Sequence, residues 1–212
     1  MNRLIAIGDI HGCYYSLVNL INKLNINKET DTLVFTGDYI DRGKNSFEVL
    51  SYLQKLQKEM NCICLLGNHE DIMLDALDSN DKQLWKCNGG TKTIKNYHRN
   101  NKPLKTHYNW LKSLPLYYET DKYIFCHAGL PKTKLEDNDK DDMLWDIDWI
   151  FDKVEPNEKQ VVFGHYQNEK IFYSLNGNIG IDTGCYFGGK LSALIITDDK
   201  LSVIDVEKDE RD

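Results

Sequence analysis

The first third of the chain alternates short apolar segments with segments whose apolar residues recur at helical spacing. The apolar segments are residues 3–7, 32–36 and 62–66. The segments between them carry apolar residues about one helical turn apart, at Leu17, Leu20, Ile21 and Leu24 and then at Phe47, Leu50, Leu53 and Leu56. A third helix is expected to begin near Glu70. This β-α-β-α-β order predicts a parallel sheet with right-handed crossovers.

After residue 78 the alternation of strands and helices gives way to a polar helical segment and then to a series of short strands. Residues 78–114 are polar and predicted to be helical, with a break at Asn88-Gly89-Gly90. Short strands separated by turns are then predicted at residues 123–126, 160–163, 171–173, 179–182, 191–197 and 201–206. Short connections favour antiparallel pairing, so we expect a second, more antiparallel sheet. The predicted fold class is α/β, with two stacked mixed β-sheets flanked by helices in a single domain over residues 1–212.

The composition narrows the class of protein. The 212 residues contain 26 Lys and Arg and 33 Asp and Glu, a net charge of −7, which argues against a nucleic-acid partner or an anionic membrane. No apolar run approaches the roughly 20 residues of a membrane helix, and Asp9 follows the N-terminus too closely for a signal peptide. We interpret the six cysteines as reduced core thiols of a cytoplasmic protein.

Several residues outside the motifs are expected to have only structural roles. We expect His98 and His107 to lie on the surface, and Trp145 and Trp149, at helical spacing, to pack in the core. Residues 207–212 are expected to form a frayed tail.

A polar motif follows each of five predicted strands. In chain order the motifs are GDIHG from residue 8, GDYIDRG from residue 37, GNHE from residue 67, HAG from residue 127 and GH from residue 164. Ligands of open α/β sheets bind outside the carboxyl ends of the strands. We therefore expect the five motifs to converge on one crevice.

The side chains in these motifs predict a metal centre. The donors are carboxylate, amide and imidazole groups without a thiolate: Asp9, His11, Asp38, Asn68, His127 and His165. Such mixed sets suit Mn, Fe or Zn. Six ligands are too many for one catalytic ion with an open position, but they suit two ions about 3.5–4 Å apart that share a carboxylate. Asp38 is the expected bridge, and a hydroxide bound to both ions is the expected nucleophile.

Three further residues fit phosphoryl chemistry. His69 follows the ligand Asn68 and is predicted to be the general acid for the leaving oxygen. Asp41 is the expected orienting partner of His69, and Arg42 offers a planar fork for two phosphoryl oxygens. Together these groups predict hydrolysis of a phosphomonoester or a phosphoanhydride.

Each motif taken alone also fits an ordinary structural role. His127 and His165 could each be a hydrogen-bonded core histidine, and Asn68 could be a helix N-cap. The order of all five motifs is the stronger signal.

In this order the motifs resemble those of the metallophosphoesterases, and more closely those of the phosphoprotein phosphatase family in its short bacterial and phage form. The resemblance also covers residues 88–90 and 181–189, and so spans almost the whole chain. It implies a calcineurin-like sandwich in which one metal is held by Asp9, His11 and Asp38. It assigns the second metal to Asp38, Asn68, His127 and His165. It also implies His69 as the acid, Asp41 as its partner, and Arg42 with Asn68 as ligands of the substrate phosphate.

One departure from that family bears on the substrate. Its short bacterial members often carry a second phosphate-binding arginine just after a Leu/Ile-Trp pair, whereas here Leu144-Trp145 is followed by Asp146, and no arginine lies between Arg99 and Arg211.

Three functions follow from these observations. The first is a serine/threonine protein phosphatase with two divalent metal ions, most simply Mn, acting on a phosphoprotein or a phosphorylated small molecule. The alternative is a symmetrical bis(5'-nucleosyl)-tetraphosphatase, and a distant third is a non-catalytic interaction module. The sequence leaves the oligomeric state open.

Overall fold

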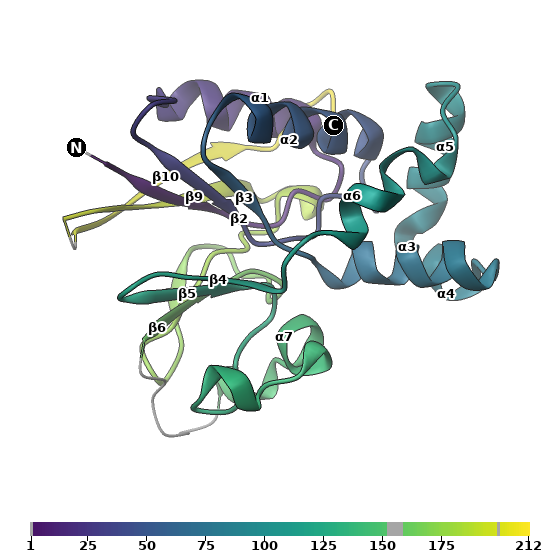
Figure 1. Ribbon diagram of the computed structural model, residues 1–212. Helices are drawn as coiled ribbons and strands as arrows, with labels where there is room; N and C mark the ends of the chain where they lie inside the picture. The colour runs from purple at the N-terminus through teal and green to yellow at the C-terminus, as the bar shows by residue number, and fades with distance from the viewer. Residues whose placement is uncertain (1, 152–158, 199) are drawn as a thin grey trace.

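Two five-stranded β-sheets lie face to face in the computed structural model, which describes residues 2–151, 159–198 and 200–212 (Figure 1). The first sheet has the order β10-β9-β1-β2-β3, and the second has the order β4-β5-β6-β8-β7. The strands are β1 (Leu4–Ile7), β2 (Thr32–Phe35), β3 (Cys62–Cys64), β4 (Tyr117–Glu119), β5 (Tyr123–Cys126), β6 (Gln160–Phe163), β7 (Phe172–Tyr173), β8 (Ile179–Gly180), β9 (Lys190–Thr197) and β10 (Lys200–Glu207). The predicted α/β class with two mixed sheets is confirmed.

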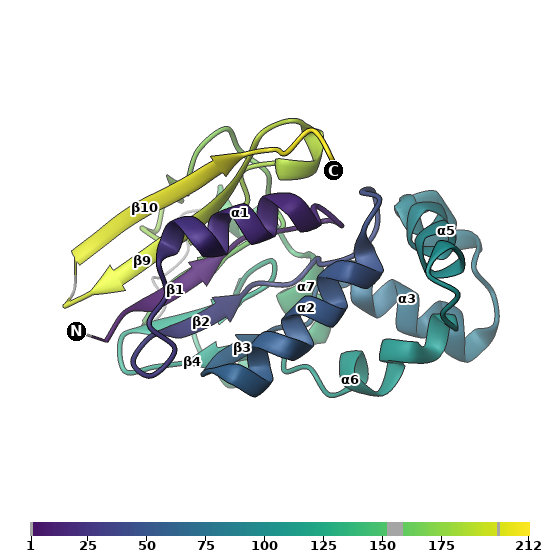
Figure 2. The same ribbon diagram turned by 90° about the horizontal axis from the view of Figure 1, so that it is seen from above.

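Helices cover the outer faces of this sandwich. The α-helices are α1 (Tyr14–Leu24), α2 (Ser46–Glu59), α3 (Asn68–Ser79), α4 (Gln83–Trp85), α5 (Thr91–Arg99), α6 (Tyr108–Lys112) and α7 (Lys140–Trp145). Shorter 3₁₀ or π segments are Lys86–Gly90, Leu104–His107, Leu135–Asp137, Asp148–Ile150 and Cys185–Phe187. Helices α1 and α2 lie over the first sheet and α3, α5 and α6 stand to one side of it (Figure 2), while α7 lies beyond the second sheet (Figure 1). Among the described residues, no helix has the length and apolar character needed to cross a membrane.

The alternation of side chains along each strand produces three apolar layers. On β1, Ile5 and Ile7 pack with the helices above the first sheet, whereas Ala6 faces the second sheet. Phe125 and Val162 of the second sheet belong to the same central layer as Ala6. The opposite face of the second sheet packs against the segment that contains Trp149. This central layer fixes the two sheets to each other, and so fixes the loops that leave them.

The pairing of the later strands corrects two expectations. β9 and β10 do not join the second sheet, because β9 pairs antiparallel with β1 and extends the first sheet. The second sheet is also less antiparallel than expected, since β6 pairs parallel with both β5 and β8. Strand β4 was not predicted at all. An apolar segment between turns predicts a strand but does not show which strand is its neighbour.

The C-terminal segment is ordered against α1, so the prediction of a frayed tail is wrong. The carboxylate of Asp212 accepts hydrogen bonds from the backbone nitrogens of Tyr15 and Ser16, at 3.0 and 2.9 Å, and from the Ser16 hydroxyl at 2.7 Å. These are first-turn amides of α1, which have no partner within the helix. The tail therefore caps α1.

Two aromatic expectations are also corrected. His107 is buried and hydrogen-bonds with the Tyr97 hydroxyl at 2.6 Å, whereas His98 is exposed as expected. Trp149 is buried, but Trp145 is 43% exposed. The cysteines are all free and, apart from the exposed Cys87, buried.

Candidate active site

The five motifs meet at one edge of the sandwich. They follow the carboxyl ends of β1, β2 and β3 in the first sheet and of β5 and β6 in the second. Two hydrogen bonds join the loops of the two sheets. His127 Nδ1 donates to the Thr36 carbonyl at 2.9 Å, and the His165 amide donates to the Asp9 carboxylate at 3.0 Å. The predicted convergence of the motifs is therefore confirmed.

Backbone strain is concentrated at this edge. Nine non-glycine residues among those described have positive φ, and five of them are predicted site residues: His11, Asp38, Asp41, Arg42 and His165, at 45 to 67°. The others are Asn or Asp, the residue types that tolerate this region best: Asn25, Asn80, Asn101 and Asp198. A left-handed histidine or arginine costs of order 1–3 kcal/mol and persists only where its surroundings impose it. The backbone conformations of His11, Arg42 and His165 are thus imposed by the fold.

The carboxylate of Asp38 lies at the centre of the site. Its Oδ2 is 3.4 Å from His11 Nε2, and its Oδ1 is 3.5 Å from His127 Nε2. The backbone nitrogen of His69 donates to Oδ1 at 3.1 Å from the first turn of α3. Burial raises the pKa of Asp38, but the surrounding histidines, His127 foremost, lower it below its ordinary value. Asp38 is therefore an anion shared by both halves of the site.

His11 and His127 face the Asp38 carboxylate with their Nε2 atoms, which carry no proton. His11 Nδ1 lies 2.9 Å from the Ile40 carbonyl, and His127 makes the equivalent contact with Thr36. Since a carbonyl oxygen can only accept, Nδ1 carries the proton in both rings and Nε2 keeps its lone pair. Burial lowers the pKa of His11 and of His165 to about 3 in each case. These rings are neutral at pH 7, which is the state that binds metals.

The second half of the site is formed by side-chain atoms of Asn68, His127 and His165 that lie close together. His127 Nε2 lies 3.0 Å from Asn68 Oδ1 and 3.1 Å from His165 Nδ1. Among the described residues, ligand atoms of Asp38, His127 and His165 lie within 4.8 Å of one another, as do those of Asp38, His11 and His69. The two groups share Asp38 and could each hold a metal ion, although the first contains His69, the predicted acid, in place of the predicted ligand Asp9. Imidazole, amide and carboxylate groups that converge in a buried site can hold a cation between them.

Asp9 stands apart from these two groups. It is not a member of either one, although it is buried and accepts from the His165 amide. Burial raises its pKa, and so do the nearby charges of Asp182 and Asp38. Asp9 thus lies in the same acidic pocket, and its role as a ligand stays a prediction.

His69 is held by a buried carboxylate. Its Nδ1 lies 2.9 Å from Asp41 Oδ2, and its Nε2 lies 3.9 Å from Asp38 Oδ2. Asp41 also accepts from Trp85 Nε1 at 3.0 Å and from the Thr93 hydroxyl at 2.6 Å. Burial lowers the pKa of His69, but Asp38 and Asp41 raise it above its ordinary value of 6.5. His69 can therefore carry a proton near neutral pH.

Arg42 borders the site on the His11 side. Its Nη1 donates to His11 Nε2 at 2.8 Å, and its guanidinium lies 5.5 Å from the centre of the Phe187 ring. The Asn88-Gly89-Gly90 motif passes behind it, and a side chain at Gly89, which has a φ of 103°, would come within 3.0 Å of the Arg42 backbone. A planar cation at the rim can bind phosphoryl oxygens.

Glu70 fixes the loop that carries Asp38. Its carboxylate accepts from the backbone nitrogens of Asp38 and Tyr39 at 2.9 Å each and of Ile40 at 3.2 Å. A side chain at Gly67 would lie 2.3 Å from the Asp38 nitrogen, so only glycine allows α3 to approach this loop. The GNHE motif thus supplies both a candidate acid and the support for the central carboxylate.

Comparison with known proteins identifies the family. Residues 2–204 match the family described as calcineurin-like phosphoesterase. The chain belongs to this family. The calcineurin-like phosphoesterase is accordingly a hydrolase that acts on phosphoester bonds.

Its relatives include two kinds of enzyme. The phosphoesterase is 32% identical to serine/threonine-protein phosphatase 2 of Salmonella typhimurium over 200 residues, 88% of this chain and 89% of that one. It is 35% identical to a symmetrical bis(5'-nucleosyl)-tetraphosphatase of Wigglesworthia glossinidia brevipalpis over 134 residues, 62% of this chain and 46% of the other. Its fold matches a cold-active protein-tyrosine phosphatase of a Shewanella species with a TM-score of 0.75 at 18% identity, covering 99% and 81% of the two chains.

Sequence reasoning missed several residues of the phosphoesterase site. Trp85 and Thr93 hold Asp41, and Asp182 lies close enough to Asp9 to raise its pKa. No local sequence pattern pointed to Trp85. In the structure its indole ring packs against Gly90, where a side chain would come within 2.5 Å of the ring.

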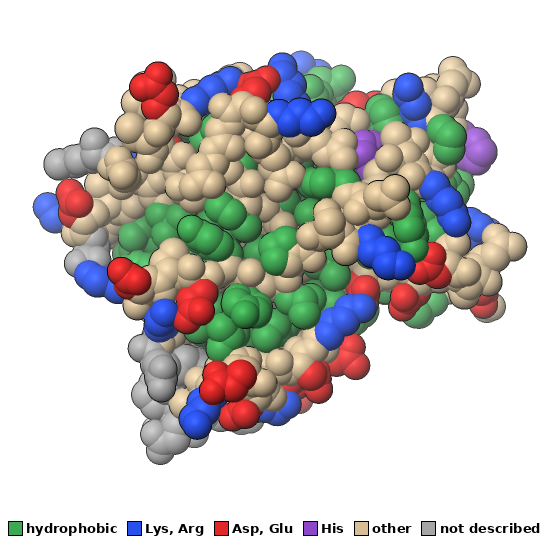
Figure 3. Space-filling view, in the orientation of Figure 1, with side chains coloured by type: hydrophobic (Ala, Val, Ile, Leu, Met, Phe, Trp, Pro, Cys, Tyr) green, Lys and Arg blue, Asp and Glu red, His purple; other side chains and the backbone are tan. Residues whose placement is uncertain are grey.

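The region around Trp145 is acidic. The Trp145 ring lies 6.2 Å from the His165 ring, so it borders the site. The side chains around it include Asp139, Asp141, Asp142, Asp146 and Asp148. Figure 3 shows acidic side chains gathered over α7 on the face it presents. The position of the second arginine in the resembling family therefore carries negative charge in this chain.

Proposed function

We propose that the chain is a serine/threonine protein phosphatase that uses two divalent metal ions. The observation that carries the proposal is the buried Asp41–His69 pair beside a carboxylate shared by two groups of acceptors. The Salmonella phosphatase, which is similar over nearly the whole of both chains, supports the substrate class.

The donor set suits the two metal ions. We assign one to Asp9, His11 and Asp38, and the other to Asp38, Asn68, His127 and His165. These are nitrogen and oxygen donors, which favours Mn and also admits Fe or Zn. A cation at His11 Nε2 would replace the present hydrogen bond from Arg42. When bound, such a pair supplies Lewis acidity at the phosphoryl group and a strong nucleophile at neutral pH.

The side chains of this protein supply the remaining chemistry. Arg42 and Asn68 hold the phosphoryl oxygens, and Arg42 neutralises charge as it develops. His69 gives its proton from Nε2 to the serine or threonine oxygen as the phosphorus–oxygen bond breaks. Asp41 keeps the Nδ1 proton of His69 in place, and Trp85 and Thr93 keep Asp41 in place.

The proposal also covers the boundaries of the catalytic domain and the cellular compartment of the enzyme. We propose one catalytic domain over residues 1–212, supported by the family match over residues 2–204. The cytoplasmic location stays a prediction.

The proposal is tested by hydrolysis of p-nitrophenyl phosphate and of a phosphoserine peptide by the Mn²⁺-loaded protein. Turnover of both is expected. Failure on both substrates by protein that has bound metal would contradict the phosphatase assignment.

The second candidate is hydrolysis of a dinucleoside tetraphosphate. It is favoured by the missing arginine after Trp145 and by the partial similarity to the Wigglesworthia enzyme. Comparing kcat/KM on diadenosine tetraphosphate and on the phosphoserine peptide decides between the two. A higher value for the dinucleotide would replace the first proposal with the second.

A further inference from the structure

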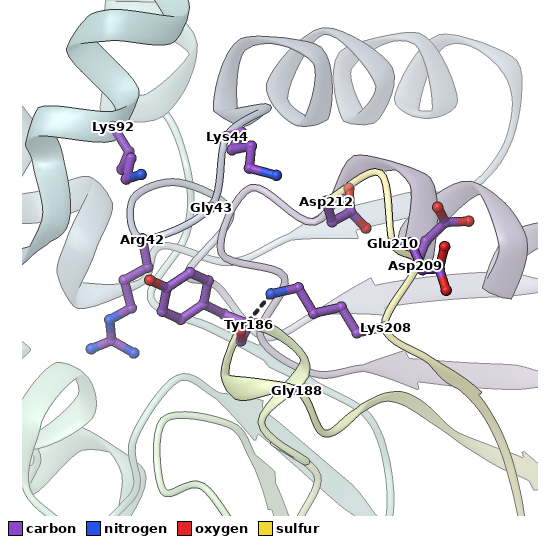
Figure 4. Close-up of a pocket in the computed structure, with 10 residues that line it drawn as sticks. All are labelled: Arg42, Gly43, Lys44, Lys92, Tyr186, Gly188, Lys208, Asp209, Glu210 and Asp212. Carbon is purple, nitrogen blue, oxygen red and sulfur yellow. Dashed lines mark hydrogen bonds between the residues drawn. The ribbon is translucent and has the colours of Figure 1, made fainter.

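A basic cavity lies beside the candidate active site. Its volume is about 490 Å³, and its lining includes Arg42, Lys44, Lys92, Lys208 and Tyr186 (Figure 4). The whole chain carries a net charge of −7, so three lysines around one cavity, with the stem of Arg42 beside them, run against the overall balance. This local concentration of positive charge can attract an anionic group.

The carboxylates on the cavity wall are largely occupied by other partners. Asp212 accepts from the Ser16 hydroxyl and from the Tyr15 and Ser16 amides. Asp209 accepts from Arg211 Nε and Nη2, at 2.8 Å each. Of the acidic groups in the lining, this leaves the exposed Glu210 as the main one facing the lysines.

Two of the three lysines, in contrast, remain available. Lys44 and Lys92 are exposed, and neither ammonium group forms an ion pair with a described residue. The Lys208 ammonium donates to the Tyr186 carbonyl at 2.8 Å and lies 5.0 Å from the centre of the Tyr186 ring. Figure 4 shows Lys44 and Lys92 above the cavity and Lys208 below it.

Arg42 connects this cavity with the metal ligands. Its backbone and stem border the cavity, while its guanidinium points away from the lysine ammonium groups (Figure 4) and bonds to His11. A substrate whose phosphoryl group is held by Arg42 can therefore extend past this residue into the basic cavity.

We propose that the cavity is a substrate subsite that binds an acidic group of a phosphopeptide, close in sequence to the phosphorylated residue. The inference rests on the proposed protein phosphatase function. Aspartate, glutamate and a second phosphorylated residue share the required chemistry, an anion that pairs with lysine. A nucleobase is a poorer occupant because the one aromatic ring in the lining, Tyr186, is already covered by Lys208.

The test compares kcat/KM for matched phosphoserine peptides. One set carries Asp on either side of the phosphoserine, a second carries another phosphoserine there, and a neutral set carries Asn. Diadenosine tetraphosphate and p-nitrophenyl phosphate complete the panel. We expect the acidic peptides to be preferred, and the preference to shrink as NaCl is raised, because salt screens exposed charges.

The decisive variant is the double substitution Lys44→Ala and Lys92→Ala. Exposed charge pairs are weak, so the preference for acidic over neutral peptides should fall by about 3- to 10-fold. The matched control is Lys58→Ala with Lys102→Ala, which removes the same charge from two exposed lysines outside the cavity. Lys92→Glu serves as a second variant and should lower the preference by a similar factor, because it also changes the charge of the lining by two.

The outcomes distinguish failure of the subsite from failure of the phosphatase function. Equal kcat/KM for acidic and neutral peptides, or a preference that the double variant keeps, overturns the subsite while leaving the phosphatase intact. Hydrolysis of p-nitrophenyl phosphate without hydrolysis of any peptide overturns the proposed function and the subsite with it. A dependence on the lysines seen only with diadenosine tetraphosphate assigns the cavity to a nucleotide and contradicts the peptide proposal.

Discussion

Strand β2 has a buried carboxylate near each end, and the two have very different surroundings. Asp31 precedes the strand and is paired with Arg3, whose Nε lies 3.1 Å from both carboxylate oxygens, and it also accepts from the Asn27 amide at 2.8 Å. Asp38 follows the strand and faces the Nε2 atoms of His11 and His127. Both side chains are only 2% exposed.

The different surroundings of Asp31 and Asp38 indicate that the first contributes to the stability of the fold and the second to the active site. Asp31 has a permanent cation and hydrogen-bond donors, so its burial is compensated within the chain. Asp38 is surrounded by imidazole lone pairs and accepts one backbone hydrogen bond from His69. Asp38 thus depends on imidazoles, which carry positive charge only when protonated, and a bound cation would supply that charge permanently. We therefore expect Asp31 to serve folding and Asp38 to serve catalysis.

Replacing the central carboxylate should have the largest effect. Asp38→Asn removes the anion shared by both groups of ligands, and metal catalysis is worth several kcal/mol. We expect kcat/KM to fall by about 10⁴-fold or more on p-nitrophenyl phosphate. A variant that keeps wild-type turnover would remove Asp38 from the centre of the site.

Removing the candidate acid should have the next largest effect. His69→Asn should lower kcat by about 10²–10⁴-fold for a phosphoserine peptide, whose leaving group needs a proton. The loss should be smaller for p-nitrophenyl phosphate, whose leaving group departs as an anion. Metal content, measured in parallel, should be unchanged. Equal losses on the two substrates would argue against a proton-donor role for His69.

At the opposite end of β2, substitution should affect stability and not turnover. Asp31→Asn leaves the part-buried Arg3 without its anion and should lower the free energy of unfolding by about 1–3 kcal/mol in urea titrations. The kcat of the folded variant should match the wild type, because Asp31 lies at the far end of the strand from the motifs. A fall in kcat comparable to that of His69→Asn would contradict the assignment of Asp31 to stability alone.

The smallest expected effect is the pH dependence of that stability difference. Burial raises the pKa of Asp31, but hydrogen bonds from Arg3 and the Asn27 amide lower it below its ordinary value of 3.8. The stabilisation is therefore present above pH 3.8 and is lost as pH falls through the lowered pKa. The difference between wild type and Asp31→Asn should narrow at acid pH in urea titrations. A difference in the free energy of unfolding that stays constant with pH would show that the charge of Asp31 does not produce the stabilisation.

The same comparison explains what the sequence could reveal. The five motifs could be found because each follows a strand directly, and the parallel order of β1, β2 and β3 brings their ends together. The pair of His69 and Asp41 was predictable for the same reason, since both lie in motifs at neighbouring strand ends.

Other features depend on contacts that no local pattern encodes. Trp85 reaches Asp41 from 44 positions further along the chain, and Asp212 reaches Ser16 across 196 positions. β9 pairs with β1 from the other end of the sequence. Runs of apolar residues predicted these strands, but the choice of neighbour depends on packing of the whole sandwich.

The central claim is that separate motifs gather around a pair of cations, and metal stoichiometry tests it most directly. Purified protein should be stripped of metal, titrated with Mn²⁺ by calorimetry and checked by elemental analysis, alongside Asp38→Asn and the Asp31→Asn control. The account predicts two ions per chain for the wild type and for Asp31→Asn, and fewer for Asp38→Asn. No binding by folded wild-type protein, or unchanged binding by Asp38→Asn, would contradict it.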